Sequence, residues 1–183
     1  MAGFFKKLFG GGQQEEAAPA APAQEAAPEL VKSVLAAHMS GQVLELSKID
    51  EPMFASGALG PGTAIEPTNG QVLAPADGEI TVAFPTGHAF GLRTADGLEL
   101  LIHVGFDTVE LDGKFFSPKV EKGAQVKKGD VLVEADLEGI KEAGYAITTP
   151  LVVTNYRQLK AEAQALTDQV AAGDDLLEVS RPA

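Results

Sequence analysis

Two histidines in the middle of the chain are the side chains best suited to chemistry. His103 lies in the strand-like run 98–105, Leu-Glu-Leu-Leu-Ile-His-Val-Gly, and His88 precedes it by fifteen positions. A neutral imidazole at physiological pH can act as a nucleophile, a proton carrier or a metal ligand. A lone strand histidine is more often an ordinary polar residue with a hydrogen-bond partner, so a chemical role requires that the two side chains meet.

The loop between the two histidines decides whether they meet. The Asp-Gly pair at 96–97 is a reversal signal typical of a β-hairpin. A two-residue loop would place Phe90 opposite His103, with His88 diagonally placed on the same face of the sheet. A four-residue loop, 94–97, would pair His88 with His103 directly. A three-residue loop would send the histidines to opposite faces, because one step of register turns a side chain over.

The residues around His103 suggest an open apolar site above a core. Leu101 and Gly105 share the face of His103, which leaves that face apolar and accessible. The opposite face carries only apolar side chains and is expected to be buried. These side chains are Leu98, Leu100, Ile102 and Val104.

The elements that must position the histidines are short strands separated by turns. Strand-sized apolar runs alternate with Gly, Pro and Asp signals from about residue 42 to residue 155, which predicts an all-β, mainly antiparallel sandwich or barrel-like domain. The strand-sized runs lie at 43–46, 71–73, 79–82, 131–134, 151–153 and 176–179. Helical tendency is limited to 137–144, ended by Gly144, and to 155–171, with Asn155 as the N-cap.

Composition excludes several classes of protein. The chain has 183 residues, 45% of them hydrophobic, which is enough for one domain with a core and tails. It has no cysteine, so disulfides and a cysteine nucleophile are absent, which fits a cytoplasmic protein. A formal net charge of −12 argues against nucleic-acid binding and favours partners with basic faces. No apolar run is long enough to span a membrane.

The chain divides into three segments. Residues 1–12 form an amphipathic N-terminal segment, in which Phe and Leu residues within 4–9 can share one side of a short helix and two lysines the other. Such a segment could lie on the inner face of an anionic membrane, although it could equally contact nothing. Residues 13–40 read as a flexible linker rich in Ala, Pro and Glu, and residues 41–183 as the folded domain. Because the chain ends soon after this domain, we expect a free-standing protein.

The order and content of these motifs resemble the glucose-type enzyme IIA family of the bacterial phosphoenolpyruvate-dependent sugar phosphotransferase system. The nonapeptide that begins with His103, residues 103–111, is the most specific of them. The others are shared in part with lipoyl and biotinyl domains. The matching segments lie at 62–67, 74–80, 86–90, 103–111, 126–130 and 149–155.

The resemblance implies a compact β-sandwich of the duplicated-hybrid-motif type that relays phosphate. The residue matching His103 would accept a phosphoryl group from phosphorylated HPr and pass it to a cysteine of the IIB domain of a sugar permease. The residue matching His88 would assist, and Thr86 would orient His88. Such a protein is a phosphotransferase component rather than a stand-alone enzyme, and the sugar is selected by the membrane-spanning IIC domain.

The resemblance also implies a docking face and partners. An apolar ring with an acidic rim suits a brief encounter with a basic partner. The implied docking residues are Asp50, Phe54, Phe84, Phe90, Asp107, Val109 and Glu110, with core packing as the alternative for the aromatics and for Phe84 above all. We expect Asp107 to face basic groups of the partner. Regulated permeases, glycerol kinase or adenylate cyclase are further possible partners in such a family.

No cofactor is required for this role. The resemblance implies one metal, a zinc ion at a partner interface, held by His88, His103 and a carboxylate lent by the partner. Two other readings remain open on sequence alone: a lipoyl or biotinyl carrier modified at Lys114 or Lys128, and a histidine-liganded zinc hydrolase. His38 lies outside every motif and is expected to be exposed to solvent.

Overall fold

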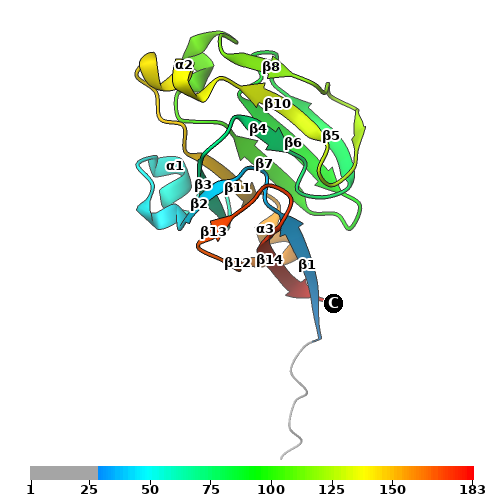
Figure 1. The fold of residues 1–183 in the computed structure, drawn as a ribbon. Coiled ribbons are helices and arrows are strands. Elements are labelled where there is room, and N and C mark those ends of the chain that lie inside the picture. Colours follow the sequence, from blue (N-terminus) through cyan, green and yellow to red (C-terminus); the bar gives the residue numbers. More distant parts are fainter. Residues whose placement is uncertain (1–28) are drawn as a thin grey trace, which may run out of the picture.

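Short antiparallel strands make up most of the structure. The computed structural model describes residues 29–183 (Figure 1). Its strands are β1 Leu30–Ala36, β2 Gly41–Leu44, β3 Gly62–Pro67, β4 Gln71–Leu73, β5 Gly78–Ala83, β6 Ala89–Thr94, β7 Glu99–His103, β8 Phe116–Pro118, β9 Gln125–Val126, β10 Val131–Ala135, β11 Thr149–Val153, β12 Glu162–Ala165, β13 Gln169–Val170 and β14 Asp175–Pro182. Its helices are α1 Pro52–Ala55, α2 Leu137–Glu142 and α3 Tyr156–Leu159, with 3-10 turns at Leu46–Lys48 and Thr108–Leu111. The predicted antiparallel β fold with short helices is confirmed.

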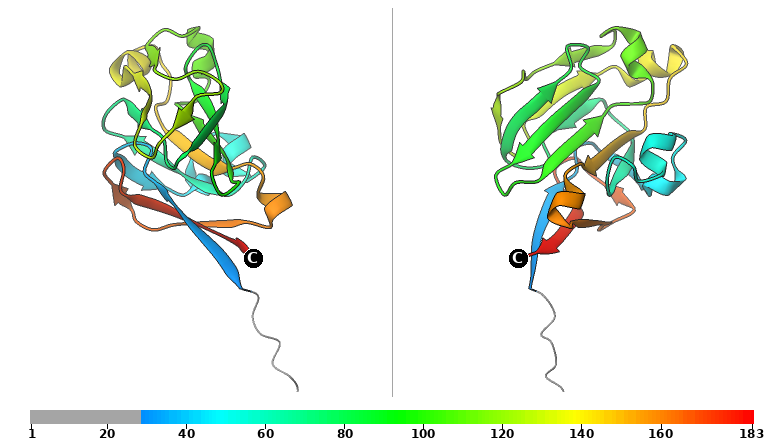
Figure 2. Two further views of the ribbon diagram at one scale, coloured as in Figure 1. Left: turned by 90° about the vertical axis from the view of Figure 1, so that its right-hand side faces the viewer. Right: turned by 180° about the vertical axis from the view of Figure 1, so that it is seen from behind.

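The strands form one large sheet and two small ones. The large sheet has eight strands in the order β13-β2-β3-β11-β7-β6-β5-β9, so β7 with its histidine lies between β11 and β6. The small sheets have the orders β4-β10-β8 and β1-β14-β12. Two further views show the β1 and β14 ribbons side by side at the end of the molecule where the C-terminus lies (Figure 2).

The large sheet buries apolar side chains on both faces. Alternation in β7 places Leu100 and Ile102 in the main core, at 2% and 0% exposure. Side chains of β4, β10 and β14 fill the same cluster from the small sheets. The other face of β7 contributes Leu101 to a smaller cluster under α1, together with Phe54. The predicted division of this strand into a core face and an open face is therefore correct.

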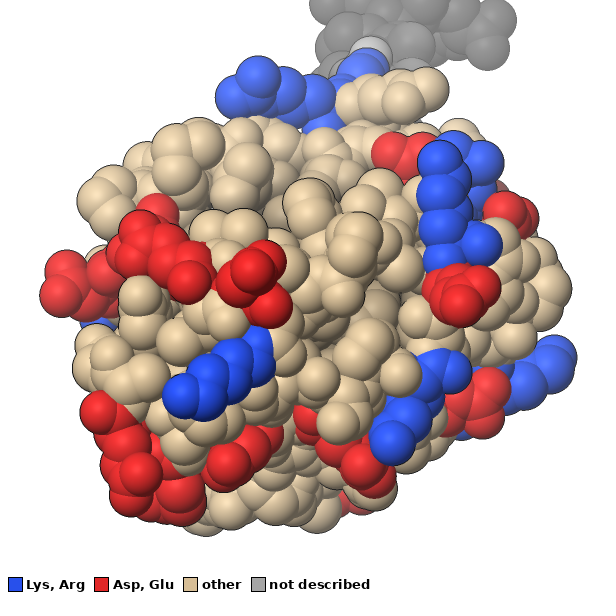
Figure 3. All heavy atoms as spheres, turned by 90° about the horizontal axis from the view of Figure 1, so that it is seen from above, with Lys and Arg blue, Asp and Glu red and all other residues tan. Residues whose placement is uncertain are grey.

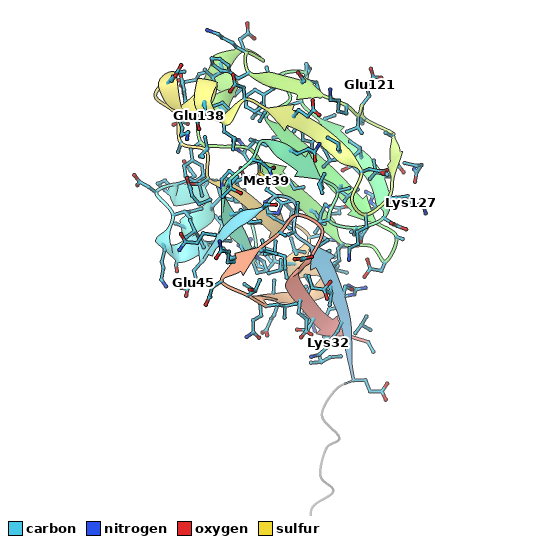
Figure 4. All side chains as sticks on the ribbon, viewed as in Figure 1. Lys32, Met39, Glu45, Glu121, Lys127 and Glu138 are labelled. Carbon is cyan, nitrogen blue, oxygen red and sulfur yellow. The ribbon has the colours of Figure 1, made fainter. Side chains whose placement is uncertain are left out.

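The folded domain begins earlier than predicted. Residues 30–36 form β1, which pairs with β14 from Leu30 opposite Pro182 to Leu35 opposite Leu177. Figure 4 shows Lys32 on this strand and Met39 inside the fold, where Met39 is fully buried. The prediction of a flexible linker is therefore wrong for residues 30–40, because pairing with a distant strand outweighs their weak local signal. The predicted amphipathic segment 1–12 and the linker up to residue 28 lie outside the described residues.

His38 is buried, which contradicts its predicted exposure. The side chain is 0% exposed, and its Nε2 donates a hydrogen bond to the carbonyl oxygen of Thr149 at 2.9 Å. A carbonyl only accepts, so Nε2 carries the proton, and Nδ1 has no partner among the described residues. Burial lowers the pKa of His38 to about 4, only partly opposed by this hydrogen bond.

His38 should make the fold sensitive to acid. In the unfolded chain a histidine takes up its proton near pH 6.5, whereas in the fold it stays neutral down to about pH 4. The unfolded state therefore binds more protons in this window, and stability is lost as the pH falls from 6.5 to 4. We expect this site to cost the wild type about 3 kcal/mol of unfolding free energy at pH 4.

The variant His38→Gln tests this expectation, because glutamine can donate to Thr149 but does not titrate. Urea unfolding at several pH values between 7 and 4 should show a shallower loss of stability in the variant than in the wild type. All other titrating groups are common to both proteins and cancel in the comparison. Parallel curves would mean that His38 accepts its proton within the fold at little cost.

The predicted helix over 155–171 is wrong beyond its first turn. Helix α3 ends at Leu159, and Lys160 adopts a left-handed conformation with φ of 50°. The next residues form β12, which pairs with β14. The side chain of Asn155 does not cap α3, because it accepts a hydrogen bond from the Glu99 backbone N–H and donates one to the Gly97 carbonyl. Long-range pairing has overridden helix propensity here.

The helix predicted over 137–144 is present as α2, Leu137–Glu142, and its cap at Asp136 was not predicted. In α2 the side chain of Asp136 accepts a hydrogen bond from the backbone N–H of Gly139 at the N-terminus of the helix. Gly144 has a φ of 93° just beyond its end. Charged side chains of both signs are interspersed on the face seen from above, with several acidic clusters (Figure 3). On this face the acidic side chains thus lie in patches rather than being evenly spread.

Candidate functional site

The two histidines lie next to each other. Their ring centroids are 5.1 Å apart, and the ring planes are inclined at 74°. The register pairs Ala89 of β6 with His103 of β7, and Thr94 donates to the carbonyl of Leu98, so the hairpin loop is the three-residue segment 95–97. We predicted that a three-residue loop would separate the histidines, and that prediction is wrong.

The reason is that His88 is not part of the regular strand. Strand β6 begins at Ala89, and His88 follows a turn in which Gly87 has a φ of 74°. The carbonyl of His88 still accepts a hydrogen bond from the backbone N–H of Val104 at 2.7 Å. Because the turn releases the side chain from strand alternation, His88 reaches the face that carries His103.

Each of the two rings is oriented by a hydrogen bond at its Nδ1 atom. His103 Nδ1 donates to the carbonyl oxygen of Gly105 at 2.7 Å, and His88 Nδ1 is 2.5 Å from the hydroxyl oxygen of Thr86. The predicted contact between Thr86 and His88 is thus present. Gly105 has a φ of 75°, and a Cβ at this position would lie 2.4 Å from the Ala146 carbonyl oxygen. Glycine is therefore needed at 105 to bring its carbonyl to the histidine.

Both imidazoles are held neutral. Burial, followed by the proximity of His103, lowers the pKa of His88 to about 4. Burial also lowers the pKa of His103, against opposing effects from the Gly105 hydrogen bond and the carboxylates of Glu51 and Asp107. With both Nδ1 atoms engaged, each ring has only Nε2 left for other chemistry. The pair can therefore act as a nucleophile and a hydrogen-bond donor at neutral pH.

Two of the predicted aromatics flank the pair. Phe54 contacts His103 edge-on at 5.9 Å between ring centroids, and Phe84 lies 5.0 Å from His88. Phe84 is 43% exposed, so the alternative that it packs in the core is wrong. Phe90 is 0% exposed and lies in the main core, on the opposite face of β6 from Ala89. Its predicted place in the docking ring is therefore wrong, because strand alternation turns it away from the histidines.

The predicted acidic residues line one groove beside the site. Asp50, Asp107 and Glu110 line a cavity of about 440 Å³, where the hydroxyl of Tyr145 donates to Glu110. Val109, also predicted for this face, is 52% exposed. An acidic groove beside an exposed apolar surface suits a basic partner.

Sequence reasoning missed Glu51 and Met53. The side chain of Glu51 accepts a hydrogen bond from the Met53 backbone N–H and so caps α1, which holds Phe54 against His103. The charge of Glu51 also acts on His103. A signal was present, because an acidic residue before Pro52 at the first helical position is typical of a helix start.

Residues 29–183 lack two features that other functions would require. This part of the chain contains no group of three or more His, Cys, Asp or Glu side chains placed to hold a metal ion. A histidine-liganded zinc hydrolase therefore has no support from this part of the chain. None of the helices described here is long and apolar enough to cross a membrane.

Comparison with known proteins gives a consistent result. Residues 33–159 match the family described as phosphoenolpyruvate-dependent sugar phosphotransferase system, EIIA 1. A glucose-specific EIIA component from Halalkalibacterium halodurans is 40% identical over 96% of this chain and 97% of its own length. A beta-glucoside-specific EIIBCA component from the same organism is 50% identical over 82% of this chain, which spans only 24% of that relative. Glucose permease IIA from Mycoplasma capricolum has a similar structure, with a TM-score of 0.74, 33% identity and coverage of 81% of this chain and 96% of that one.

Proposed function

The chain belongs to the EIIA 1 family of the phosphoenolpyruvate-dependent sugar phosphotransferase system, and we propose that His103 is the residue that carries its phosphoryl group. The chain is thus a phosphocarrier component of sugar transport. The observation that carries the proposal is the hydrogen bond from His103 Nδ1 to the Gly105 carbonyl. It places the ring proton on Nδ1 and leaves the lone pair on Nε2, which is the nucleophilic atom.

The reaction is an exchange between two nitrogens. The lone pair of His103 Nε2 attacks phosphorus, the new N–P bond forms, and the N–P bond of the donor histidine breaks, returning its electron pair to the donor ring. The proton on His103 Nδ1 stays in place during this step. The carbonyl of Gly105 stabilises the positive charge that the ring gains. In onward transfer a thiolate of the acceptor attacks phosphorus, an S–P bond forms, and the N–P bond to His103 breaks and returns its electron pair to Nε2.

His88 stabilises the phosphoryl group in transit. If the Thr86 hydroxyl donates to His88 Nδ1, then His88 Nε2 carries the proton and can donate it in a hydrogen bond to a phosphoryl oxygen. Support comes from the lowered pKa of His88, which keeps the ring neutral with a single N–H. Thr86 is therefore a positioning residue that acts through His88.

Replacing Thr86 with valine should slow phosphoryl transfer about tenfold, the low end for partners that orient a functional histidine. Valine keeps the shape of threonine but removes the hydroxyl. The nitrogen chemical shifts of the His88 ring should then report a mixture of tautomers instead of one. Thr86→Ser is the matched control and should keep both the rate and the tautomer. An unchanged tautomer in Thr86→Val would remove Thr86 from this role.

The proposed partners follow from the phosphate relay. HPr would be the donor, and the cysteine of a IIB domain would be the acceptor. The second partner is supported by relatives whose names join EIIB, C and A in one component, such as those from Halalkalibacterium halodurans and Dickeya chrysanthemi. In those relatives a IIA segment and a IIB segment belong to one chain, which favours direct transfer between them.

Zinc fits the site only as a shared metal. The Nε2 atoms of His88 and His103 could supply two ligands, and a tetrahedral zinc ion needs four. Residues 29–183 offer no third ligand in a cluster with them, so a partner would have to provide the rest. The ion would tie two proteins together and would block Nε2 of His103 while bound.

Phosphorylation of the full chain tests the proposal directly. The chain is incubated with phosphoenolpyruvate, enzyme I and HPr, and its intact mass is measured. We expect one added group of about 80 Da that is lost in acid, as a phosphohistidine would be. A folded chain that gains no mass under these conditions would overturn the assignment.

A further inference from the structure

Exposed apolar side chains gather around the histidine pair. Four large apolar residues on this side are between 42% and 53% exposed: Met53, Val82, Phe84 and Val109. Val82 pairs with Gly91, which pairs in turn with Leu101, so Val82 lies across the sheet on the face of His103. We call these four residues the apolar rim. A soluble domain exposes such a surface where something covers it at least part of the time.

The apolar rim has acidic neighbours. Four carboxylates lie on the same side. Asp50, Asp107 and Glu110 line one groove. Glu51 and Asp107 are close enough to His103 to raise its pKa. Lys48, the one basic side chain lining that groove, is paired with Glu45. An occupant of this surface should therefore combine aromatic or aliphatic side chains with positive charge.

The chain contains one segment with that chemistry. Residues 4–9 read Phe-Phe-Lys-Lys-Leu-Phe, so three aromatics and a leucine accompany two lysines. We propose that this segment docks on the apolar rim of its own molecule and competes with the phosphoryl donor for access to His103. The inference rests on the proposed function, because it makes the same surface the target of both.

The length of chain before β1 permits this contact. Twenty residues, 10–29, separate the segment from Leu30, where β1 begins. At about 3.3 Å per residue they can span roughly 65 Å. A domain of this size is roughly 40 Å across. The segment can therefore reach any face of the molecule, and charge and apolar character decide where it binds.

The other apolar surfaces fit this segment less well. A cavity of about 680 Å³ beside α3 is lined by Pro61 and Tyr156, but also by Arg157 and Lys160, which would repel the two lysines. The exposed side chains of β1 include Leu30 and Val34, but Glu178 of β14, which lies opposite Val34, is already paired with Lys32. The apolar rim, by contrast, has four carboxylates beside it, and the one lysine lining its groove is already paired.

Docking of this kind would weaken the encounter with the donor without preventing it. A tether of this length gives an effective concentration of about 1 mM. If the intrinsic Kd is about half this effective concentration, about one third of the molecules are open, and the apparent KM for the donor rises about threefold. Removing the contact should therefore lower the apparent KM about threefold and leave kcat unchanged.

A spin label on the full chain tests the contact itself. The sequence has no cysteine, so Ala2→Cys offers a single attachment point. Paramagnetic broadening of backbone amide signals should concentrate at residues 53, 82–84 and 107–110. It should disappear in Lys6→Glu/Lys7→Glu and weaken at high salt, whereas the matched control Gln13→Glu/Gln14→Glu, which adds the same kind of charge outside the segment, should keep it.

Other patterns of broadening would overturn the inference. Broadening of signals beside α3 would place the segment on that surface. No local broadening at all would mean that the segment does not dock on the apolar rim. If no broadening appears in solution but the segment binds vesicles that contain anionic lipid, the segment would be assigned to the membrane instead. The readout needs no phosphoryl transfer, so a chain that shows the contact but gains no phosphate would refute only the proposed function. A chain that is phosphorylated without the contact would refute only the docking.

Discussion

The variant His103→Gln will gain no phosphoryl group from phosphorylated HPr. Glutamine can still donate a hydrogen bond, but its amide nitrogen has no available lone pair for attack on phosphorus. Because the His103 ring is only half-buried and forms one side-chain hydrogen bond, to Gly105, the fold should survive the change. We therefore expect that the variant is as stable as the wild type. It should not gain the mass of about 80 Da that one phosphoryl group adds.

Intact mass spectrometry with urea unfolding measures both parts of this expectation. His38→Gln is a matched control, because it removes a buried histidine that is bonded to Thr149 and is not part of the histidine pair, and it should be phosphorylated normally. Phosphate retained by folded His103→Gln would move the acceptor to another side chain. Phosphate lost from both variants would point to damage of the fold rather than to the chemistry of one residue.

The rate at which the chain accepts the phosphoryl group should depend only weakly on pH in mildly acidic solution. Burial lowers the pKa of His103 below its usual value, so the neutral nucleophile persists as the pH falls. An exposed histidine would lose about three quarters of its neutral form between pH 7.5 and 6, given a pKa of about 6.5. We expect the rate of acceptance by the chain to change much less over this range, once the donor has been phosphorylated separately.

Local signals were sufficient to predict the strands that hold the site. Alternation in 98–104 separates a core face from the face of His103, and the structure keeps that division. The turn at 95–97 lies where the Asp-Gly signal predicted it. These features depend on neighbours in sequence, which a single sequence displays directly.

Features that depend on distant partners were beyond local signals. Strand β1 and the burial of His38 depend on β14 and on Thr149, both more than a hundred residues away. Strand β14 also pairs with residues 162–165, which therefore do not adopt the helical conformation that their composition favours. No pattern within either segment reveals that a strand edge is available to it.

The histidine pair was predicted correctly through an incorrect argument. Register alone would have separated the side chains, and the turn at Gly87 brings them together. The resemblance of 86–90 to a known motif carried information on backbone geometry that strand alternation does not contain. Phe90 shows the reverse error, because it lies within that motif but belongs to the core.

Replacing His88 with glutamine will separate assistance from acceptance. The variant should still gain one phosphoryl group at equilibrium, since His103 Nε2 remains available. Transfer in both directions should slow about 10²–10³-fold, the usual effect of removing one donor that stabilises charge in a transition state. Quenched-flow measurement of the acid-labile phosphate, with the donor in excess, gives the rate of the first transfer.

The double variant Thr86→Val/His88→Gln decides whether the two residues act together. If Thr86 works only by orienting the His88 ring, its replacement should have no further effect once that ring is gone. Additive losses would mean that Thr86 contacts the phosphoryl group or its donor independently. Equal rates for wild type and His88→Gln would assign the close approach of the two rings to packing, and His103 with its Gly105 hydrogen bond would then suffice for the relay.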